Sequence, residues 1–225
     1  MIRSEYPIQP VLIGSGDTGI AGVLELPPGP RGIVLLTTNQ LAHRPATNFH
    51  HLGHELRRAG LATLRLDPPG LDQQRTGQYF LDLAQLGARL GCASAWLAEE
   101  KVTKNLALGL FGTGREAAAA LQLAARQPDR VAAVVSSDGR PDLAGPDVLA
   151  QVRAPTLLLV DEQDPVVVGH NRRALELLPC EKDLAMIRDA RDRIGQPELP
   201  QEIARLAARW FAGYLRTNTD RRPLH

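Results

Sequence analysis

LGLFGTGREAAAAL, residues 108–121, is the stretch that decides the fold. Its first half is a continuous apolar run, which is typical of a parallel strand buried on both faces. The GTG that follows indicates a tight glycine turn, and the alanine-rich second half predicts a helix with a small face that can pack closely on a sheet. The segment therefore predicts a strand, a sharp turn and a helix, with Gly114 at the centre of the turn.

Other apolar runs alternate with helical patterns along the rest of the chain. We expect extended segments at Val11–Ile13, Ile20–Leu26, Gly32–Thr37, Leu61–Asp67, Leu106–Phe111, Val131–Ser136, Pro155–Val160 and Leu184–Ile187. Apolar stripes at helical spacing predict helices through Leu83, Leu86, Leu90, Ala93 and Leu97, and through Ile203, Leu206, Ala207, Trp210 and Leu215. Strand–helix alternation after an N-terminal hairpin predicts a three-layer α/β/α sandwich around a mostly parallel, eight-stranded sheet, as a single domain over residues 1–225.

Composition excludes several classes of function. The 225 residues carry 26 basic and 25 acidic side chains, so the net charge of +1 gives no reason to expect nucleic acid or an anionic membrane as a partner. Aromatic residues make up only 4% of the chain, which disfavours a stacking platform for single strands. Two cysteines cannot form a disulfide framework, and neither a secretory signal nor an apolar stretch of about 18–20 residues is present, so we expect a cytoplasmic protein.

Several stretches together resemble the dienelactone-hydrolase-like branch of the α/β-hydrolases over nearly the whole chain. They are RGIVLL, AGLATLRLDPPG, DQQRTGQ, GLFGTGREAAAAL, RVAAVVSSDGRPDLAG, APTLLLVDEQDPVV with NRRALELL, and ARLAARWF. The resemblance implies the α/β-hydrolase fold and a nucleophile, an acid and a histidine that follow successive strands in that order. This chemistry needs all three groups, because the imidazole activates the nucleophile and the carboxylate orients the imidazole.

The nucleophile position of the resembled family falls on Gly114, which has no side chain to offer. An alignment shifted by one residue would place Thr113 there instead, but a β-branched residue resists the strained backbone of such a turn. None of the serines lies in a G-x-S-x-G pattern, although Ser136 and Ser137 end a strand expected near the turn. The sequence therefore predicts that the nucleophile has been replaced.

The acid position is retained and the base position is not. Asp164 follows the PTLLLV strand at the position of the family acid, where it would otherwise serve as a turn carboxylate before Pro165. The loop expected to carry the histidine, RDARDRIGQPELPQ, contains none, and Asp192 aligns with that position. Downstream of Asp164 the only histidines are His170 and His225, neither of which lies where the fold delivers a base.

Several other residues are candidates for contact with a ligand. Main-chain donors near Thr38 and Asn39 correspond to the oxyanion side of the resembled family. Arg115 adds a cation at a helix N-terminus, so a small anion is a reasonable ligand, and the alternative is a surface pair between Arg115 and Glu116.

Two further segments match motif-like stretches of the family. Arg75 and Tyr79 lie before a helix beside the expected cleft, and Arg140 and Asp142 lie in the DGRP segment. These residues either contact substrate in active relatives or tie loops together, and the sequence leaves both open.

The histidines at 43, 50, 51 and 54 gather around a helix start, but an i, i+4 pair lacks the third ligand that a zinc site needs. GLFGTG lacks the G-x-G-x-x-G order of a dinucleotide site. We therefore expect no metal and no cofactor.

The sequence predicts a non-hydrolytic homologue that retains a cleft for a small ligand, preferably an anion, or for a protein partner. The alternatives are a divergent carboxylic-ester or lactone hydrolase that uses Thr113, Ser136 or Ser137 with a non-standard histidine, and a structural subunit with a vestigial cleft.

Overall fold

A computed structural model describes residues 8–14, 19–37, 49–67, 81–188 and 201–215. Its strands are β1 Ile8–Ile13, β2 Ile20–Glu25, β3 Gly32–Thr37, β4 Leu61–Leu66, β5 Ala107–Gly114, β6 Val131–Gly139, β7 Thr156–Asp161 and β8 Lys182–Ile187. Its helices are α1 His50–Arg58, α3 Leu83–Glu99, α4 Arg115–Arg126, the 3-10 turn η3 Pro141–Ala144, α5 Pro146–Leu149, α6 Pro165–Leu177 and α7 Gln201–Tyr214. Among these helices none is long and apolar enough to cross a membrane.

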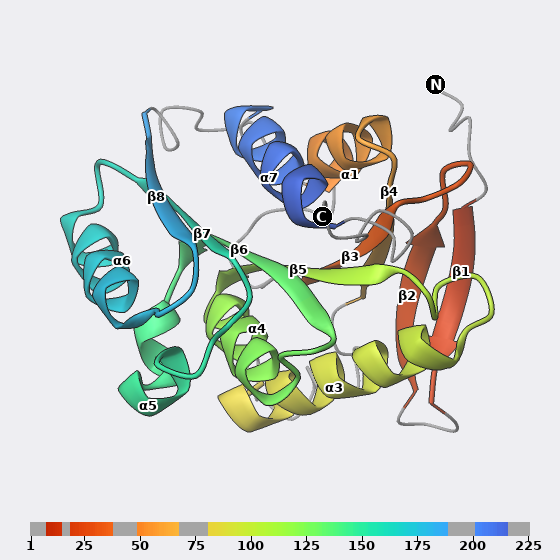
Figure 1. The fold of residues 1–225 in the computed structure, drawn as a ribbon, viewed down its shortest axis with the longest axis horizontal. Coiled ribbons are helices and arrows are strands. Elements are labelled where there is room, and N and C mark those ends of the chain that lie inside the picture. The colour runs from red at the N-terminus through yellow and green to blue at the C-terminus, as the bar shows by residue number, and fades with distance from the viewer. Residues whose placement is uncertain (1–7, 15–18, 38–48, 68–80, 189–200, 216–225) are drawn as a thin grey trace, which may run out of the picture.

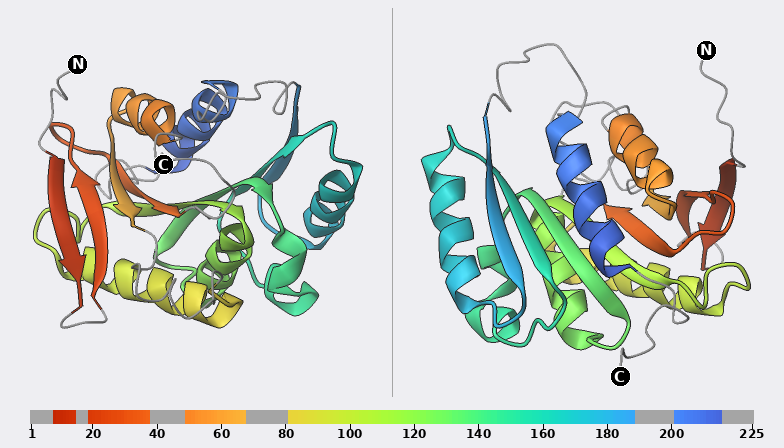
Figure 2. Two further views of the ribbon diagram at one scale, coloured as in Figure 1. Left: turned by 180° about the vertical axis from the view of Figure 1, so that it is seen from behind. Right: turned by 45° about the horizontal axis from the view of Figure 1, so that its top comes forward.

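The strands form one twisted sheet in the order β1-β2-β4-β3-β5-β6-β7-β8. β1 and β2 form an antiparallel hairpin, β2 also runs antiparallel to β4, and every pairing from β4 to β8 is parallel. Helices α1 and α7 lie together on one face, and α3 and α4 lie on the other (Figures 1 and 2). The predicted three-layer α/β/α sandwich with a mostly parallel, eight-stranded sheet is confirmed.

Alternation along β5 divides the core between the two faces. Leu108 and Leu110 belong to the apolar cluster under α3 and α4, and Phe111 belongs to the cluster under α1 and α7. Gly109 lies so close to α7 that a Cβ atom there would be 2.7 Å from the ring of Phe211. The central strand is thus buried on both faces, as its continuous apolar run predicts.

Four strands are longer than their apolar runs predict: β1 begins at Ile8 and β8 at Lys182, before their expected starts at Val11 and Leu184, and β5 and β6 end later than expected. β5 continues to Gly114 and β6 continues to Gly139, beyond the expected ends at Phe111 and Ser136. Parallel pairing between the two strands extends through Thr113 and Ser137 to Gly114 and Gly139. Backbone pairing needs no apolar side chain, so the hydropathy pattern ends before the strands do.

The parallel strands all direct their carboxyl ends to one edge of the sheet, where open α/β sheets bind ligands. β5, β6 and β7 end there at Gly114, Gly139 and Asp161. After β3, β4 and β8, the chain leaves the described residues within two positions of the strand end. We call this edge the carboxyl edge.

Candidate functional site

The turn between β5 and α4 is the centre of the carboxyl edge. Gly114 ends β5 and is also the N-cap of α4, with φ 55° and ψ −125°. This backbone conformation is strained for any residue with a Cβ atom, and strand-to-helix turns that expose a nucleophile have such strain. The positive φ falls on Gly114 and not on Thr113, so the sharp turn is centred where the sequence places it.

Close packing underneath the turn depends on a second glycine. A Cβ atom on Gly112 would lie 2.7 Å from the backbone nitrogen of Ala117, a distance that real contacts do not reach. Gly112 thereby lets the first turn of α4 sit directly on β5. The turn keeps the tight geometry of a nucleophile elbow, and we call residues 112–116 the elbow.

The elbow has room for a side chain that the sequence does not supply. Among the described residues, a Cβ atom built on Gly114 would meet a single atom within 4 Å, Oε2 of Glu116 at 3.8 Å. No side chain caps the N-terminus of α4, because its N-cap residue is glycine.

Glu116 is buried at the elbow, and its burial bears on the surface pair with Arg115 that the sequence left open as an alternative. The surface pair with Arg115 does not form, because Glu116 is only 7% exposed and its Oε2 atom has no hydrogen-bond partner among the described residues. Burial raises the pKa of Glu116 to about 7, against the smaller opposing effects of its own backbone N–H and of Arg115. The signal in the sequence was a single acidic residue directly before four alanines, at the start of a helix that must pack on the sheet.

Ser136 and Ser137 lie on β6 beside the elbow, opposite Gly112 and Thr113. Their exposed fractions are 0% and 1%, and neither hydroxyl has a hydrogen-bond partner among the described residues. A hydroxyl that no substrate can reach cannot act as a nucleophile in this conformation.

Asp164, the aligned acid, lies at the start of α6 next to the carboxyl end of β7. It is the N-cap of α6, and its Oδ1 atom accepts a hydrogen bond of 3.1 Å from the backbone N–H of Val167. Capping of this kind stabilises a helix in any protein, so Asp164 has a structural role whether or not it has a catalytic one.

Neighbouring carboxylates also bind backbone. Asp138, with φ 45°, accepts a hydrogen bond of 2.9 Å from the backbone N–H of Asp161, and Asp161 accepts one of 2.9 Å from the backbone N–H of Gln163. The carboxyl ends of β6 and β7 are therefore tied together by carboxylates.

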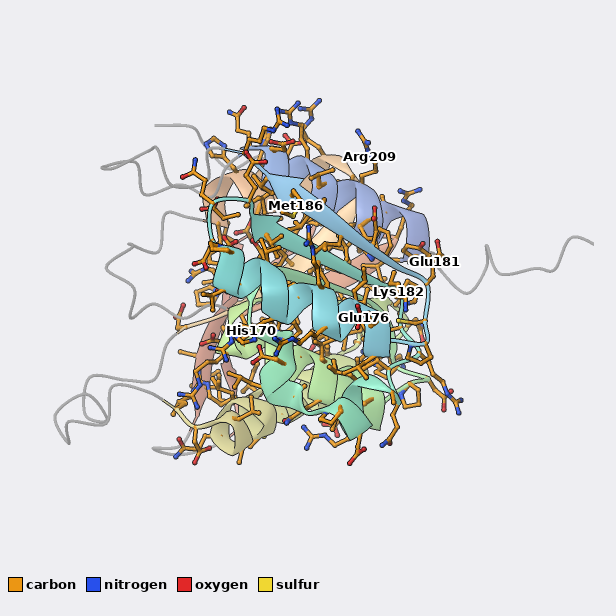
Figure 3. The ribbon with its side chains drawn as sticks, turned by 90° about the vertical axis from the view of Figure 1, so that its left-hand side faces the viewer. His170, Glu176, Glu181, Lys182, Met186 and Arg209 are labelled. Atoms are coloured by element: carbon orange, nitrogen blue, oxygen red, sulfur yellow. The ribbon has the colours of Figure 1, made fainter. Side chains whose placement is uncertain are left out.

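Arg140, Asp142 and His170 form a network beside the elbow. Arg140 donates two hydrogen bonds to Asp142, at 2.9 Å and 2.8 Å, and holds the pKa of that carboxyl below its usual range. His170 of α6 places Nδ1 at 3.4 Å from the same carboxylate, and Figure 3 shows this histidine in the first half of the helix. Because the backbone N–H of Arg140 also donates to the carbonyl of Gly114 at 2.8 Å, the DGRP segment ties η3, α6 and the elbow together.

Several predicted site residues lie outside the described part of the chain: Thr38, Asn39, Arg75, Tyr79 and Asp192. Arg115 lies at the start of α4 and is partly exposed. Of the histidine cluster, His51 and His54 lie on α1, and the described residues contain no group of three or more His, Cys, Asp or Glu side chains placed to hold a metal ion.

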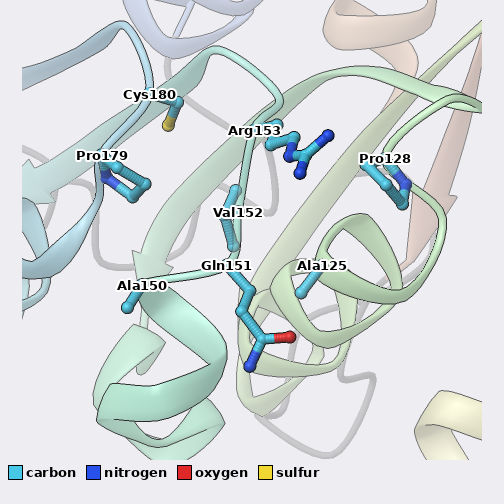
Figure 4. A pocket seen from close by; sticks show the side chains of 8 residues that line it. All are labelled: Ala125, Pro128, Ala150, Gln151, Val152, Arg153, Pro179 and Cys180. Carbon is cyan, nitrogen blue, oxygen red and sulfur yellow. The ribbon is translucent and has the colours of Figure 1, made fainter.

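A pocket lies at the opposite edge of the sheet (Figure 4). Its volume is about 540 Å³, and its lining includes Ala125 at the end of α4, Val152 and Arg153 before β7, and Cys180 before β8. These residues precede the strands, whereas the elbow follows them, so the pocket is separate from the candidate site.

Comparison with known proteins supports the α/β-hydrolase fold of the chain. A dienelactone hydrolase from Anabaena variabilis is 36% identical, with a TM-score of 0.85 over 95% of this chain and 100% of that one. Est1E from Butyrivibrio proteoclasticus has a TM-score of 0.70 over 90% of this chain and 96% of that one, and at 13% identity it supports the fold alone.

Two provisionally named phosphoribosyl transferases of Mycobacterium tuberculosis, from strains CDC 1551 and H37Rv, are each 37% identical over 205 residues. That match covers 91% of this chain and 46% of each relative, so the chain spans about half the length of these curated relatives. No family model matches the chain. The 36% identity to the Anabaena enzyme over 95% of this chain and 100% of that one, together with the shared fold, shows that this chain belongs to the dienelactone hydrolase family of the α/β-hydrolases.

Proposed function

We propose that this chain is a non-hydrolytic member of its family that uses the elbow as a binding site for a small ligand. The observation that carries the proposal is Gly114, which keeps the backbone conformation of an elbow at φ 55° and ψ −125° but has no nucleophilic atom. Glycine adopts this backbone without strain, so the turn keeps the shape of an elbow although no side chain is attached there, and the backbone N–H of Arg140 still donates to the carbonyl of Gly114 at 2.8 Å. This retained shape supports a continuing role for the elbow.

The chemistry of the family supports the same conclusion. Loss of one triad member typically lowers kcat by about 10⁴–10⁶-fold, and losses within one triad do not add. Here the nucleophile position is glycine and the base position aligns with Asp192. What remains is Asp164, whose carboxylate caps α6.

A divergent carboxylic-ester or lactone hydrolase is the second candidate, favoured by the likeness to a dienelactone hydrolase over 95% of this chain. It would need Thr113, Ser136 or Ser137 as the nucleophile. The two serine hydroxyls are buried, and His170 is paired with Asp142. These contacts weigh against hydrolysis by the described residues.

Hydrolysis assays separate the two candidates. With a panel of p-nitrophenyl esters and aryl lactones, we expect wild type and Gly114→Ser to give rates equal to a buffer blank, because a serine without a base is a weak nucleophile. Gly91→Ser serves as a matched control on α3, where a Cβ atom meets nothing within 4 Å. Wild-type turnover well above the buffer blank, kept in Gly91→Ser and abolished by Thr113→Val, Ser136→Ala or Ser137→Ala, would support the hydrolase instead.

A further inference from the structure

We propose that the ligand of the elbow is a small carboxylate, bound by the first-turn amides of α4 together with the carboxyl group of Glu116. The inference rests on the proposed binding role of the elbow and names the chemical class of its ligand. It would also identify Glu116 as a binding residue at a helix start where the sequence left a small-anion site and a surface pair with Arg115 both open.

The first part of the site is the N-terminus of α4, a helix of twelve residues. Its leading N–H groups carry the positive end of the helix dipole, and the N-cap residue, Gly114, has no side chain with which to cap them. Arg115 adds a positive charge and makes no ion pair within the described part of the chain. An anion is the group that such an end attracts.

The second, independent part is the Glu116 side chain. The residue is only 7% exposed, and Oε2 lacks a hydrogen-bond partner among the described residues. That atom lies 3.8 Å from the place where a side chain of residue 114 would begin. An oxygen–oxygen hydrogen bond is about 2.7 Å long, so a ligand oxygen at this place needs to lie only about 1 Å closer to Oε2 to form one.

Protonation decides what Glu116 can hold. Its pKa of about 7 keeps a large fraction of the carboxyl neutral near neutral pH, and a neutral carboxyl donates one hydrogen bond through O–H. The donors at the elbow, the backbone N–H groups and this O–H, then match the two oxygens of a carboxylate. A phosphate dianion fits less well, because its second charge opposes the remaining ionised fraction of Glu116.

The charged groups that the structure describes on the elements around the elbow have partners of their own. On η3, Arg140 and Asp142 pair with each other, and His170 of α6 lies against Asp142. At the ends of β6 and β7, Asp138 and Asp161 accept backbone hydrogen bonds.

On the α3 side of α4, Arg89 donates to the backbone oxygen of Asp67. Arg115 is the charged side chain that acts on Glu116, and it lowers the pKa of that carboxyl against the larger effect of burial.

Isothermal titration with benzoate as the probe tests the assignment. We expect wild type to bind benzoate with uptake of a proton above about pH 7, seen as a binding heat that depends on the ionisation enthalpy of the buffer. The affinity should fall by up to about tenfold per pH unit above that value, because a carboxylate must be paired with a protonated Glu116. Benzylammonium and inorganic phosphate should bind more weakly than benzoate.

Variants of Glu116 distinguish direct binding from a structural role. Glu116→Gln keeps a hydrogen-bond donor, so it should bind benzoate without proton uptake and without the pH dependence. Glu116→Ala should weaken binding by at least about tenfold. Glu99→Gln, an exposed acid at the end of α3, serves as the matched control and should behave like wild type.

Each remaining outcome overturns the assignment. Unchanged pH dependence in Glu116→Gln, tighter binding of benzylammonium than of benzoate, or no benzoate binding by folded wild type at about pH 6 would each do so. None of these results bears on whether the chain hydrolyses esters, so a failed carboxylate assignment leaves the non-hydrolytic proposal to its own assay.

Discussion

Gly114 and Glu116 lie two positions apart and together change what an elbow can do. Gly114 relieves the strain of a positive φ and removes the side chain that a nucleophile would need. Glu116 brings a buried carboxyl to 3.8 Å from the same place. The change at Gly114 is visible in the sequence, but the burial of Glu116 depends on how closely α4 packs against β5.

Gly114→Ala tests the backbone strain. We expect it to lower the free energy of unfolding by about 1–3 kcal/mol, because alanine at φ 55° is strained although the space around its Cβ is open. Gly91→Ala on α3 should instead raise it by about 0.5–1 kcal/mol, because a glycine inside a helix costs backbone entropy. Urea unfolding measures both, and a Gly114→Ala variant as stable as Gly91→Ala would contradict the positive φ.

Glu116→Gln tests the buried carboxyl through the pH dependence of stability. The pKa is raised from 4.5 to about 7, so the folded state binds more protons than the unfolded state between these values and wild-type stability falls as pH rises through them. Glutamine does not ionise, so the stability of the variant relative to wild type should increase by up to about 3 kcal/mol from pH 5 to pH 8.

Unfolding of wild type, Glu116→Gln and the exposed control Glu99→Gln at both pH values gives this difference directly. A constant difference between Glu116→Gln and wild type would show that Glu116 titrates normally.

β5 and α4 act as one unit because their contact is made by backbone. Gly112 lies against Ala117, and the alanines that follow Glu116 are completely or almost completely buried. The pattern of the sequence predicts this strand, turn and helix in order. It does not predict that β5 and β6 pair as far as Gly114 and Gly139, because that pairing is made by main-chain atoms that leave no hydropathy signal.

Gly112→Ala tests the close approach of the two elements. A Cβ atom at 2.7 Å from a backbone nitrogen cannot be relieved by a rotamer change, so the helix must shift, at a cost of about 1–3 kcal/mol or more. Gly213→Ala on α7 is the matched control, since its Cβ atom meets nothing within 4 Å. Thermal unfolding of the two variants should differ clearly, and equal melting temperatures would contradict the packing of α4 on β5.

The sheet as a whole brings residues from distant parts of the chain to one edge. Alternation of strands and helices is enough to predict its architecture, because parallel strands need crossover helices and buried faces. The network of Arg140, Asp142 and His170 could not be predicted in this way, because it depends on where η3 and α6 lie relative to each other.

At the edge strand β8, exposed Lys182 and Asp183 oppose pairing with another sheet (Figure 3 labels Lys182).

The central claim, that this member of a hydrolase family lacks a working nucleophile, is tested most directly by intact-mass analysis after treatment with an excess of a fluorophosphonate probe. We expect the mass of the wild-type chain to remain unchanged, because Gly114 offers no nucleophilic atom and Ser136 and Ser137 are buried. Stoichiometric addition of one phosphonyl group at a single residue, at Thr113, Ser136, Ser137 or elsewhere, would contradict the account.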